Sequence, residues 1–144
     1  MGARRKGREI AVQILYQADV AGVPLTEAFS TYEGYFSPSP RALEFAKELV
    51  NGVAEKQEEI DALIEKFSKH WKLSRMSAID RNILRLATYE LLYRPDIPPK
   101  VSINEAVELA KAFGSEESAA FVNGILDAIY REVVLKNEPR SAEA

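Results

Sequence analysis

Apolar residues recur along the chain with the three- and four-residue spacing of one helix face, and no segment shows the alternation of a half-buried strand. This spacing returns in several segments, which glycines, prolines and short polar stretches separate. We therefore expect an all-α protein, a compact bundle of about seven helices. The apolar positions that define the earlier helices are Ala11, Ile14, Leu15 and Ala18, then Ala28 and Phe29, then Leu43, Ala46 and Val50, then Ile60, Leu63, Ile64 and Phe67, and then Met76, Ile79, Ile83, Leu86 and Ala87.

Glycine and proline mark the expected ends of these helices. The first helix is expected to end near Gly22 and Pro24, and the second near Gly34. The sequence SPSP at residues 37–40 separates the second helix from the long helical region that follows. Gly52 is expected to divide that long region into two helices, which brings the total to seven.

With 144 residues, the chain is long enough for one domain that buries about 70% of its unfolded surface. A polar break near residues 70–74 suggests two small helical subdomains packed together. We expect residues 1–136 to form a single helical domain. Residues 137–144 are polar and are expected to form a flexible C-terminal tail.

Two further helices are expected within residues 101–127. Ser102 is the expected N-cap of the first, because Glu105 three positions later would complete a capping box. Gly114 is expected to end this helix in the left-handed conformation. Ser115 is the expected N-cap of the next helix.

The last helix contains Phe121-Val-Asn-Gly124, in which both Asn and Gly lower helix stability. A glycine inside a helix costs about 1 kcal/mol relative to alanine, so a close packing contact or a binding partner is the usual reason for it. Small residues recur at Ala120, Gly124 and Ala128, which favours the close approach of another helix. Asn123 lies away from the core positions on the helical wheel and is the better candidate for a polar contact. Periodicity alone assigns Phe121 to the core.

Several classes of chemistry have no support in the sequence. The chain has no cysteine and one histidine, His70, so disulfides, thiol catalysis and an ordinary zinc site are not expected. It contains no phosphate-binding loop, dinucleotide fingerprint or nucleophile elbow. Glu90 lies within an apolar stripe and is interpreted as a structural carboxylate, paired with an arginine or accepting N–H groups from the segment after Pro98. We expect no enzyme activity, cofactor or metal.

No apolar run approaches the 18 residues of a membrane span, and no signal-peptide core is present. We therefore expect a soluble, cytoplasmic protein. The formal net charge of −3 argues against indiscriminate binding of nucleic acid over the whole surface. Positive charge is concentrated at Arg4, Arg5, Lys6 and Arg8, which form a local anion-attracting end. The alternative for this end is a solvated, frayed terminus.

One side of the first helix combines this basic end with Gln13 and Tyr16. Arginines neutralise phosphates, aromatic rings stack on unpaired bases, and amides can then read the base edges. The alternative for Tyr16 is a half-buried residue at the edge of the core. Arg81 is placed by the helical wheel where it can reach solvent or a phosphate, although a solvated arginine would look the same.

Four blocks of sequence, in order, resemble the NusB family of bacterial transcription antitermination factors. They span nearly the whole chain, with residues 26–70 the least diagnostic part. The blocks are RRKGREIAVQILY at residues 4–16, IDRNILRLATYEL at 79–91, DIPPKV at 96–101, and INEAVELAK at 103–111 followed by FG and FVNGILD.

The resemblance implies a non-catalytic factor that binds the boxA element of ribosomal RNA leader transcripts as single-stranded RNA. It implies a heterodimer with the ribosomal protein NusE, which joins RNA polymerase and other Nus factors in an antitermination complex. Family members use the Tyr16 face for RNA, and the resemblance places Phe121 and Asn123 beside the RNA site. The expected RNA-binding residues are Arg4, Arg5, Lys6 and Arg8 for phosphates, Gln13, Tyr16 and Asn123 for bases, and Arg81 and Phe121 as further contacts.

The chain departs from the family pattern in two places. Gly7 interrupts the arginine run, so a looser first turn is expected, and Ala119 and Ala120 stand where some members carry basic residues. Two alternatives remain open. One is the RNA-binding domain of a ribosomal RNA cytosine methyltransferase, which would continue into a nucleotide-cofactor fold with a glycine-rich loop. The other is a protein-binding helical adaptor in which the basic end has no role.

Overall fold

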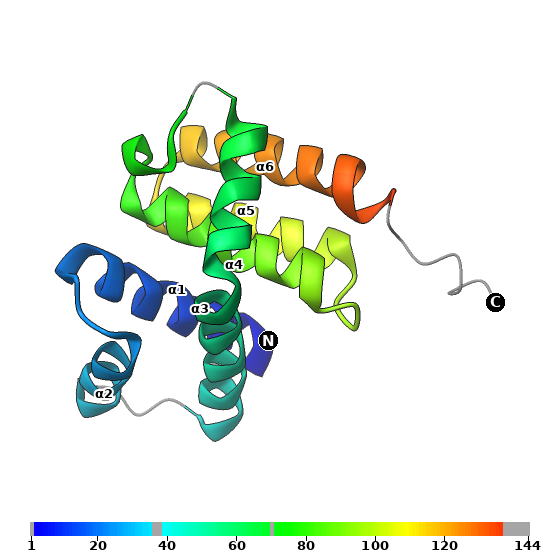
Figure 1. The fold of residues 1–144 in the computed structure, drawn as a ribbon. Coiled ribbons are helices and arrows are strands. Elements are labelled where there is room, and N and C mark those ends of the chain that lie inside the picture. Colours follow the sequence, from blue (N-terminus) through cyan, green and yellow to red (C-terminus); the bar gives the residue numbers. More distant parts are fainter. Residues whose placement is uncertain (1, 36–38, 70, 137–144) are drawn as a thin grey trace.

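A computed structural model describes residues 2–35, 39–69 and 71–136, and within these ranges the chain is all-helical, without a strand (Figure 1). The expected fold class is therefore confirmed. In chain order, the helices are α1 (Ala3–Ala21), α2 (Leu25–Tyr35), α3 (Pro40–Ser68), α4 (Ala78–Tyr93), α5 (Pro99–Phe113) and α6 (Glu116–Ile129). A short 3-10 turn at Leu73–Arg75 precedes α4, and a π-helical turn at Tyr130–Val134 continues from α6.

The expected count of seven helices is wrong by one, because α3 runs unbroken through Gly52. The helix is kinked one turn later, at Lys56, where φ is −112° and ψ is 17°. Gly52 serves a packing contact instead, since a β-carbon there would overlap the Tyr89 ring of α4. A glycine in a helical pattern can therefore mark a close neighbour as well as an end.

The long helix α3 links two groups of helices (Figure 1). α1 packs against its first half and α2 packs against α1, whereas α4, α5 and α6 pack with one another and α4 and α6 contact α3. One cluster of buried apolar side chains spans both groups. The two groups therefore share α3, and they do not separate at the break expected near residues 70–74. The tail expected at residues 137–144 lies outside the described residues.

Gly7 brings α1 close to α3. A β-carbon at this position would lie 2.8 Å from the Phe45 ring and 2.9 Å from the carbonyl oxygen of Ala42. Such contacts are shorter than van der Waals packing allows, so only glycine fits without displacing α3. α1 is helical from Ala3 onward, and the loose first turn expected from Gly7 is not observed.

The start of α5 differs from its expected position. The helix begins at Pro99, with Pro98 as the N-cap, so the prediction that Ser102 caps it is wrong. Ser102 lies one turn inside the helix and is buried, and its hydroxyl donates a hydrogen bond of 2.7 Å to Glu90. Proline suits the first turn of a helix because it lacks the N–H that would otherwise have no acceptor.

The connection from α5 to α6 confirms one prediction and contradicts another. Ser115 caps α6, and its hydroxyl oxygen accepts from the backbone N–H of Ser118 at 3.0 Å. Gly114 is not left-handed, since its φ is −123°. A β-carbon at Gly114 would instead lie 2.7 Å from the Ser118 hydroxyl oxygen, so close approach explains the glycine.

Gly124, at the centre of the small-residue ridge expected on α6, has no helix of the described residues packed against it. A β-carbon at Gly124 would meet no atom of the described residues within 4 Å. Gly124 and its neighbour Asn123 are both exposed. The prediction of close helix packing at Gly124 is therefore wrong, and nothing within the described fold requires a glycine there.

Gly52 and Gly124 support a paired prediction about stability, because one is tightly packed and the other faces open space. We expect Gly52→Ala to destabilise the protein by about 1–3 kcal/mol, because the added methyl group forces the Tyr89 ring out of its position. Gly124→Ala should stabilise it by up to about 1 kcal/mol, because alanine favours the helix and meets open space. Urea denaturation of both variants measures the difference. Equal effects of the two substitutions would contradict the packing described for Gly52.

Candidate nucleic-acid interface

A shallow cleft lies where α1, the start of α4 and the end of α5 meet. α1 contributes two glutamines and a tyrosine, α4 and its cap contribute a serine, an alanine and an isoleucine, and α5 contributes its last residue. The lining residues are Gln13, Tyr16, Gln17, Ser77, Ala78, Ile79 and Phe113. The structure thus places Gln13 and Tyr16 together, as the first-helix face predicted.

Two exposed aromatic rings belong to this cleft. Tyr16 is 40% exposed and Phe113 is 42% exposed, which is high for rings of this size. The amide side chains of Gln13 and Gln17 lie on the Tyr16 side. Rings with free faces can stack on flat apolar ligands such as nucleobases, and the amides can donate and accept hydrogen bonds at the base edges.

The start of α4 adds polar character to the cleft. Ser77 caps the helix, and its hydroxyl oxygen accepts from the N–H of Asp80 at 3.1 Å. Ala78 and Ile79 occupy the first turn, where backbone N–H groups have no acceptor within the helix. These N–H groups and the positive end of the helix dipole favour electron-rich atoms of a ligand.

The basic end of α1 is exposed at Arg4, Arg5 and Lys6, as predicted. Arg5 and Tyr16 lie roughly 16 Å apart along the axis of α1. The basic end and the cleft therefore belong to one continuous stretch of this helix.

Each of these three cations contacts a carboxylate. Arg4 lies 3.3 Å from Asp96, and Lys6 lies 3.4 Å from Glu9. Arg5 makes two hydrogen bonds to Glu105, of 3.1 and 2.7 Å. The hydrogen bond from Arg5 lowers the pKa of Glu105 below its usual value. Two hydrogen bonds from the Arg94 guanidinium, with a further one from Arg4, lower the pKa of Asp96 to about 2.

Arg8 lies in the core, contrary to the prediction that it contacts phosphate. Its side chain is 5% exposed, and its guanidinium donates two hydrogen bonds, of 2.8 and 3.0 Å, to Glu90. Glu90 also accepts from the Ser102 hydroxyl, so this cluster joins α1, α4 and α5. The structural role expected for Glu90 is confirmed. Arg8 precedes Ala11 by three positions and so lies on the core stripe, which is the sequence signal for its burial.

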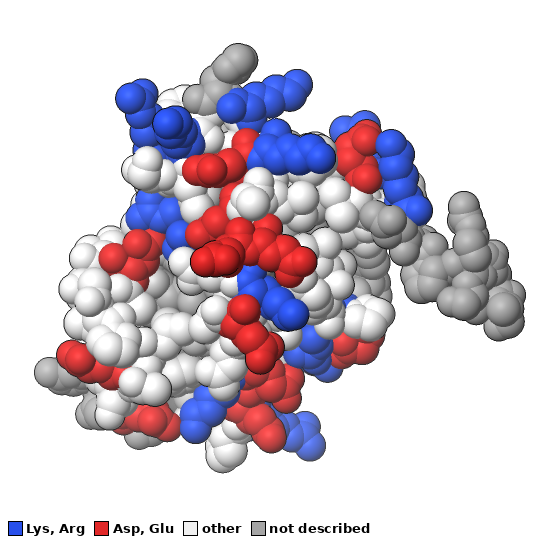
Figure 2. Space-filling view, viewed as in Figure 1, with Lys and Arg blue, Asp and Glu red and all other residues white. Residues whose placement is uncertain are grey.

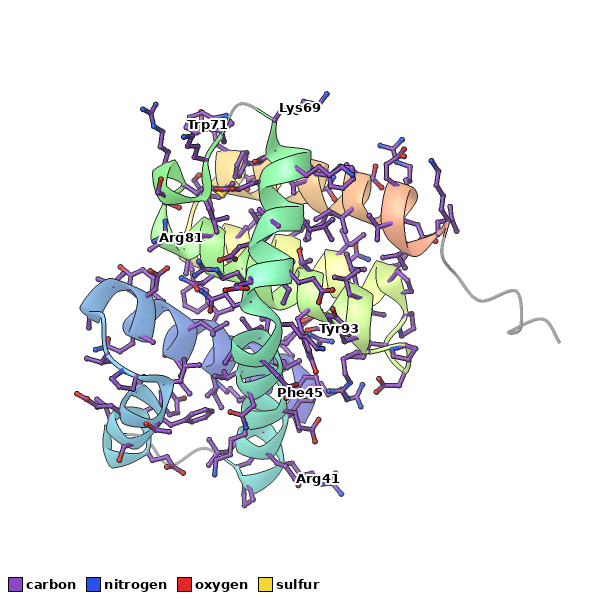
Figure 3. The ribbon with its side chains drawn as sticks, viewed as in Figure 1. Arg41, Phe45, Lys69, Trp71, Arg81 and Tyr93 are labelled. Carbon is purple, nitrogen blue, oxygen red and sulfur yellow. The ribbon has the colours of Figure 1, made fainter. Side chains whose placement is uncertain are left out.

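Arg81 is also held inside the protein rather than facing solvent. Its side chain is 15% exposed and donates to Asp19 at 2.8 Å. It donates as well to the backbone carbonyl oxygens of Leu73 and Met76, each at 3.0 Å. Figure 3 shows Arg81 between α4 and the end of α1. Arg81 therefore fixes the position of α1 against α4, and the prediction that it reaches phosphate is corrected.

A second hollow lies on the other side of Ser77. Trp71 lies beyond the end of α3 (Figure 3) and is 52% exposed. Its ring meets the half-buried Phe121 ring edge-on, with centroids 6.3 Å apart. The hollow is lined by Trp71, Arg75, Met76, Ser77, Asp80, Ser115, Glu117, Ser118 and Phe121. Phe121 is thus separate from the Tyr16 cleft, and Asn123 lines neither hollow.

Charge is unevenly distributed over the face that α3 crosses (Figure 2). Acidic side chains form a band across the middle of this view, and Lys and Arg gather mainly along its upper edge, near Trp71. Exposed residues of α3 that contribute negative charge include Glu55, Glu58 and Glu59. An acidic band of this kind repels phosphates, which disfavours this face for RNA.

Two other kinds of site find no support in residues 2–35, 39–69 and 71–136. Within these ranges no group of three or more His, Asp or Glu side chains is placed to hold a metal ion. No helix there is both long and apolar enough to cross a membrane.

Comparison with known proteins assigns the chain to a family. The model of the NusB family matches residues 5–131. The transcription antitermination protein NusB of Myxococcus xanthus is 57% identical over 143 residues, which cover 96% of this chain and 100% of that protein. The structure of T. maritima NusB aligns with a TM-score of 0.83 at 39% identity, covering 96% of this chain and 94% of that chain.

A further solved structure, of the antitermination factors NusB and NusE in complex with dsRNA, contains a chain that aligns with a TM-score of 0.82. The two are 35% identical, and the alignment covers 90% of this chain and 96% of that chain. The related proteins carry the names of antitermination factors and not of enzymes, which confirms the expectation of a non-enzymatic protein. With the family model matching most of its length and relatives near half identity, the chain belongs to the NusB family.

Proposed function

We propose that this protein is a transcription antitermination factor that binds boxA RNA of ribosomal RNA leader transcripts in the cleft between α1, α4 and α5. The observation that carries the proposal is the pair of exposed rings, Tyr16 and Phe113, in one cleft beside two glutamine amides. In a soluble protein of this size, exposed aromatic rings that share a cleft favour a stacked ligand. Membership in the NusB family supports RNA as that ligand.

The cleft suits single-stranded RNA better than a duplex. Bases inside a duplex are already stacked, so their faces are closed to protein rings, whereas unpaired bases offer both faces. Arg4, Arg5 and Lys6 would neutralise phosphates of the same strand along α1. Arg8 and Arg81 support this surface from within the protein, and neither contacts RNA in the proposal.

The second hollow is the proposed binding site for the ribosomal protein NusE. Trp71 and Phe121 form an aromatic centre. The polar residues around it carry charges of both signs, positive at Arg75 and negative at Asp80 and Glu117. An aromatic centre with a mixed polar rim is typical of a protein interface, and the two carboxylates would repel an RNA backbone. The solved complex of NusB and NusE with dsRNA supports NusE as the partner.

Ser77 belongs to both hollows, so RNA and NusE would lie side by side across the start of α4. A strand leaving the cleft could then touch NusE as well, which gives the heterodimer a higher affinity than either protein alone. We propose that this heterodimer joins RNA polymerase and other Nus factors in the cytoplasm. Asn123, exposed on α6, remains a candidate polar contact in that assembly.

The proposal is tested by RNA binding with and without NusE. Fluorescence anisotropy would compare a labelled single-stranded boxA-like RNA, a scrambled strand of the same composition and a boxA-like duplex. We expect the single boxA strand to bind best, with binding that weakens as salt rises, and added NusE to tighten it further. Equal binding of all three probes, unchanged by NusE, would contradict RNA recognition. If NusE bound to this protein but all three RNA probes still bound equally, we would conclude that the protein is a protein-binding adaptor.

The Myxococcus xanthus relative, 57% identical to this chain, carries the name of an antitermination protein. This favours the antitermination factor over the RNA-binding domain of a methyltransferase.

A further inference from the structure

The arginine best placed for a phosphate is already occupied in the free protein. Arg5 Nε lies 3.1 Å from Glu105 Oε1, and Arg5 Nη2 lies 2.7 Å from Glu105 Oε2. This two-pronged arrangement is the one in which a guanidinium also binds a phosphate group. A carboxylate therefore holds the position that an RNA phosphate would take.

Glu105 is more firmly fixed than the arginine it binds. Its side chain is 16% exposed, whereas that of Arg5 is 58% exposed. Glu105 Oε1 also lies 4.0 Å from Nη1 of the buried Arg8, which draws the carboxylate toward the protein. Arg5 can thus leave this ion pair and turn to a ligand, whereas Glu105 stays in place on α5.

The other cations of this end are held less tightly. Arg4 reaches Asp96 through a single contact of 3.3 Å, and Asp96 is already bound by the fork of Arg94 at 3.0 Å. Lys6 reaches Glu9 at 3.4 Å, and both of those side chains are at least one-third exposed. The competition between carboxylate and phosphate is therefore strongest at Arg5.

We propose that Glu105 is an intramolecular competitor of RNA, which occupies the phosphate-binding fork of Arg5 and thereby sets the affinity of the protein for RNA. This inference rests on the proposed function, since it concerns the same RNA surface. When RNA binds, Arg5 gives up the Glu105 carboxylate and takes an RNA phosphate in its place. The free energy of the lost ion pair offsets part of the free energy gained from the phosphate contact. The protein on its own is kept a weak RNA binder, and a second partner beside the cleft is then needed for tight binding.

The proposal makes three statements about the RNA binding of Glu105→Gln. The variant should bind RNA about 3- to 10-fold more tightly than wild type, because the charged competitor becomes a neutral amide. The gain should be the same for boxA-like and scrambled strands, since phosphate contacts carry no sequence information. The slope of its logarithmic affinity against logarithmic salt concentration should also be steeper by about 0.7, because no carboxylate is freed to take up a cation when Arg5 turns to the phosphate.

Glu108→Gln is the matched control. Glu108 lies on the same helix, three positions further on, and its removal changes the net charge equally. Its side chain is 62% exposed and pairs with Lys111 at 3.7 Å, not with Arg5. We expect this control to change RNA affinity by less than about 2-fold, because it acts only through screened long-range charge.

The decisive experiment measures both RNA strands against wild type, Glu105→Gln, Glu108→Gln, Arg5→Gln and the double variant Arg5→Gln/Glu105→Gln. The gain from Glu105→Gln should vanish in the Arg5→Gln background. Glu105→Asp, which keeps the charge near Arg8 but is one methylene shorter, should give part of the gain. It also serves as the second variant if Glu105→Gln melts at a lower temperature.

Four outcomes would overturn the inference. Equal effects of Glu105→Gln and Glu108→Gln would reduce the effect to net charge. Weaker binding by Glu105→Gln would mean that Glu105 holds Arg5 ready for phosphate rather than competing with it. If wild type bound neither strand, the proposed function itself would fall, and the inference with it, whereas RNA binding that depends on Arg5 but not on Glu105 would overturn the inference alone.

Discussion

Replacing Glu90 by alanine should lower the free energy of unfolding by about 3–5 kcal/mol, because it removes both hydrogen bonds of the buried Arg8 and leaves only Glu105, 4.0 Å away, opposite its charge. Arg8 and Glu90 are 5% and 1% exposed, so water cannot replace the lost carboxylate. The hydroxyl of Ser102 loses its acceptor at the same time. Urea denaturation followed by circular dichroism measures the change.

Two comparisons make this prediction specific to the buried pair. Arg131→Ala removes an exposed ion pair on the protein surface, with Asp127 at 2.9 Å, and should cost no more than about 0.5 kcal/mol. The double variant Arg8→Met/Glu90→Leu should lose less stability than Glu90→Ala, because it leaves no uncompensated charge. A loss for Glu90→Ala no larger than that for Arg131→Ala would show that this cluster does not hold α1, α4 and α5 together.

Tyr16→Ala and Phe113→Ala should each weaken binding of single-stranded boxA-like RNA by about 5- to 150-fold. This range corresponds to the roughly 1–3 kcal/mol that one stacked base contributes. Both rings are at least 40% exposed, so their removal should leave the fold and its melting temperature close to those of wild type. Fluorescence anisotropy at one fixed salt concentration measures the affinities.

Val20→Ala is the control for these two substitutions. Val20 lies on α1, four positions beyond Tyr16, and is 59% exposed, but it does not line the cleft. Its replacement removes exposed apolar surface from the same helix and should leave RNA affinity unchanged. If Tyr16→Ala behaved like Val20→Ala, stacking in the cleft would not contribute to RNA binding.

The helical fold could be predicted from the sequence because burial follows helical periodicity along the chain. The exact helix starts could not, because they depend on tertiary contacts. Ser102 satisfies the local pattern of a capping box, yet it lies inside α5. Pro98 and Pro99 start the helix earlier, and Glu90 of α4 accepts a hydrogen bond from the Ser102 hydroxyl. The Ser102 side chain therefore bonds to Glu90, twelve residues away in sequence, and does not cap a helix as the local pattern predicts.

The basic end could be recognised from the sequence, but its members could not be told apart by charge alone. Arg5 and Arg8 are separated by less than one helical turn, and only the position of Arg8 on the core stripe indicates that it is buried. Arg81 was placed outward by its angle on the wheel. Its long side chain instead folds back to Asp19 and two carbonyl oxygens, which no single-helix projection can show.

The cleft contains residues that the sequence did not single out for function. Phe113 ends α5 and Gln17 follows Tyr16, and both lie at the cleft because α1 and the end of α5 meet at the start of α4. Trp71, in the second hollow, is likewise not singled out by the sequence, and half of its surface is exposed beside Phe121. The signal for such residues is an aromatic side chain at the end of a helix, where packing leaves one ring face uncovered.

NMR mapping tests most directly whether RNA binds in the cleft between α1, α4 and α5. A single-stranded boxA-like RNA would be titrated into the 15N-labelled protein, and changes in amide and side-chain N–H signals would be assigned to residues. We expect the largest changes at Arg5, at the side-chain amides of Gln13 and Gln17, and at the backbone amides of Tyr16 and Phe113. Changes confined to the acidic face of α3, around Glu55 and Glu58, would contradict RNA binding in this cleft.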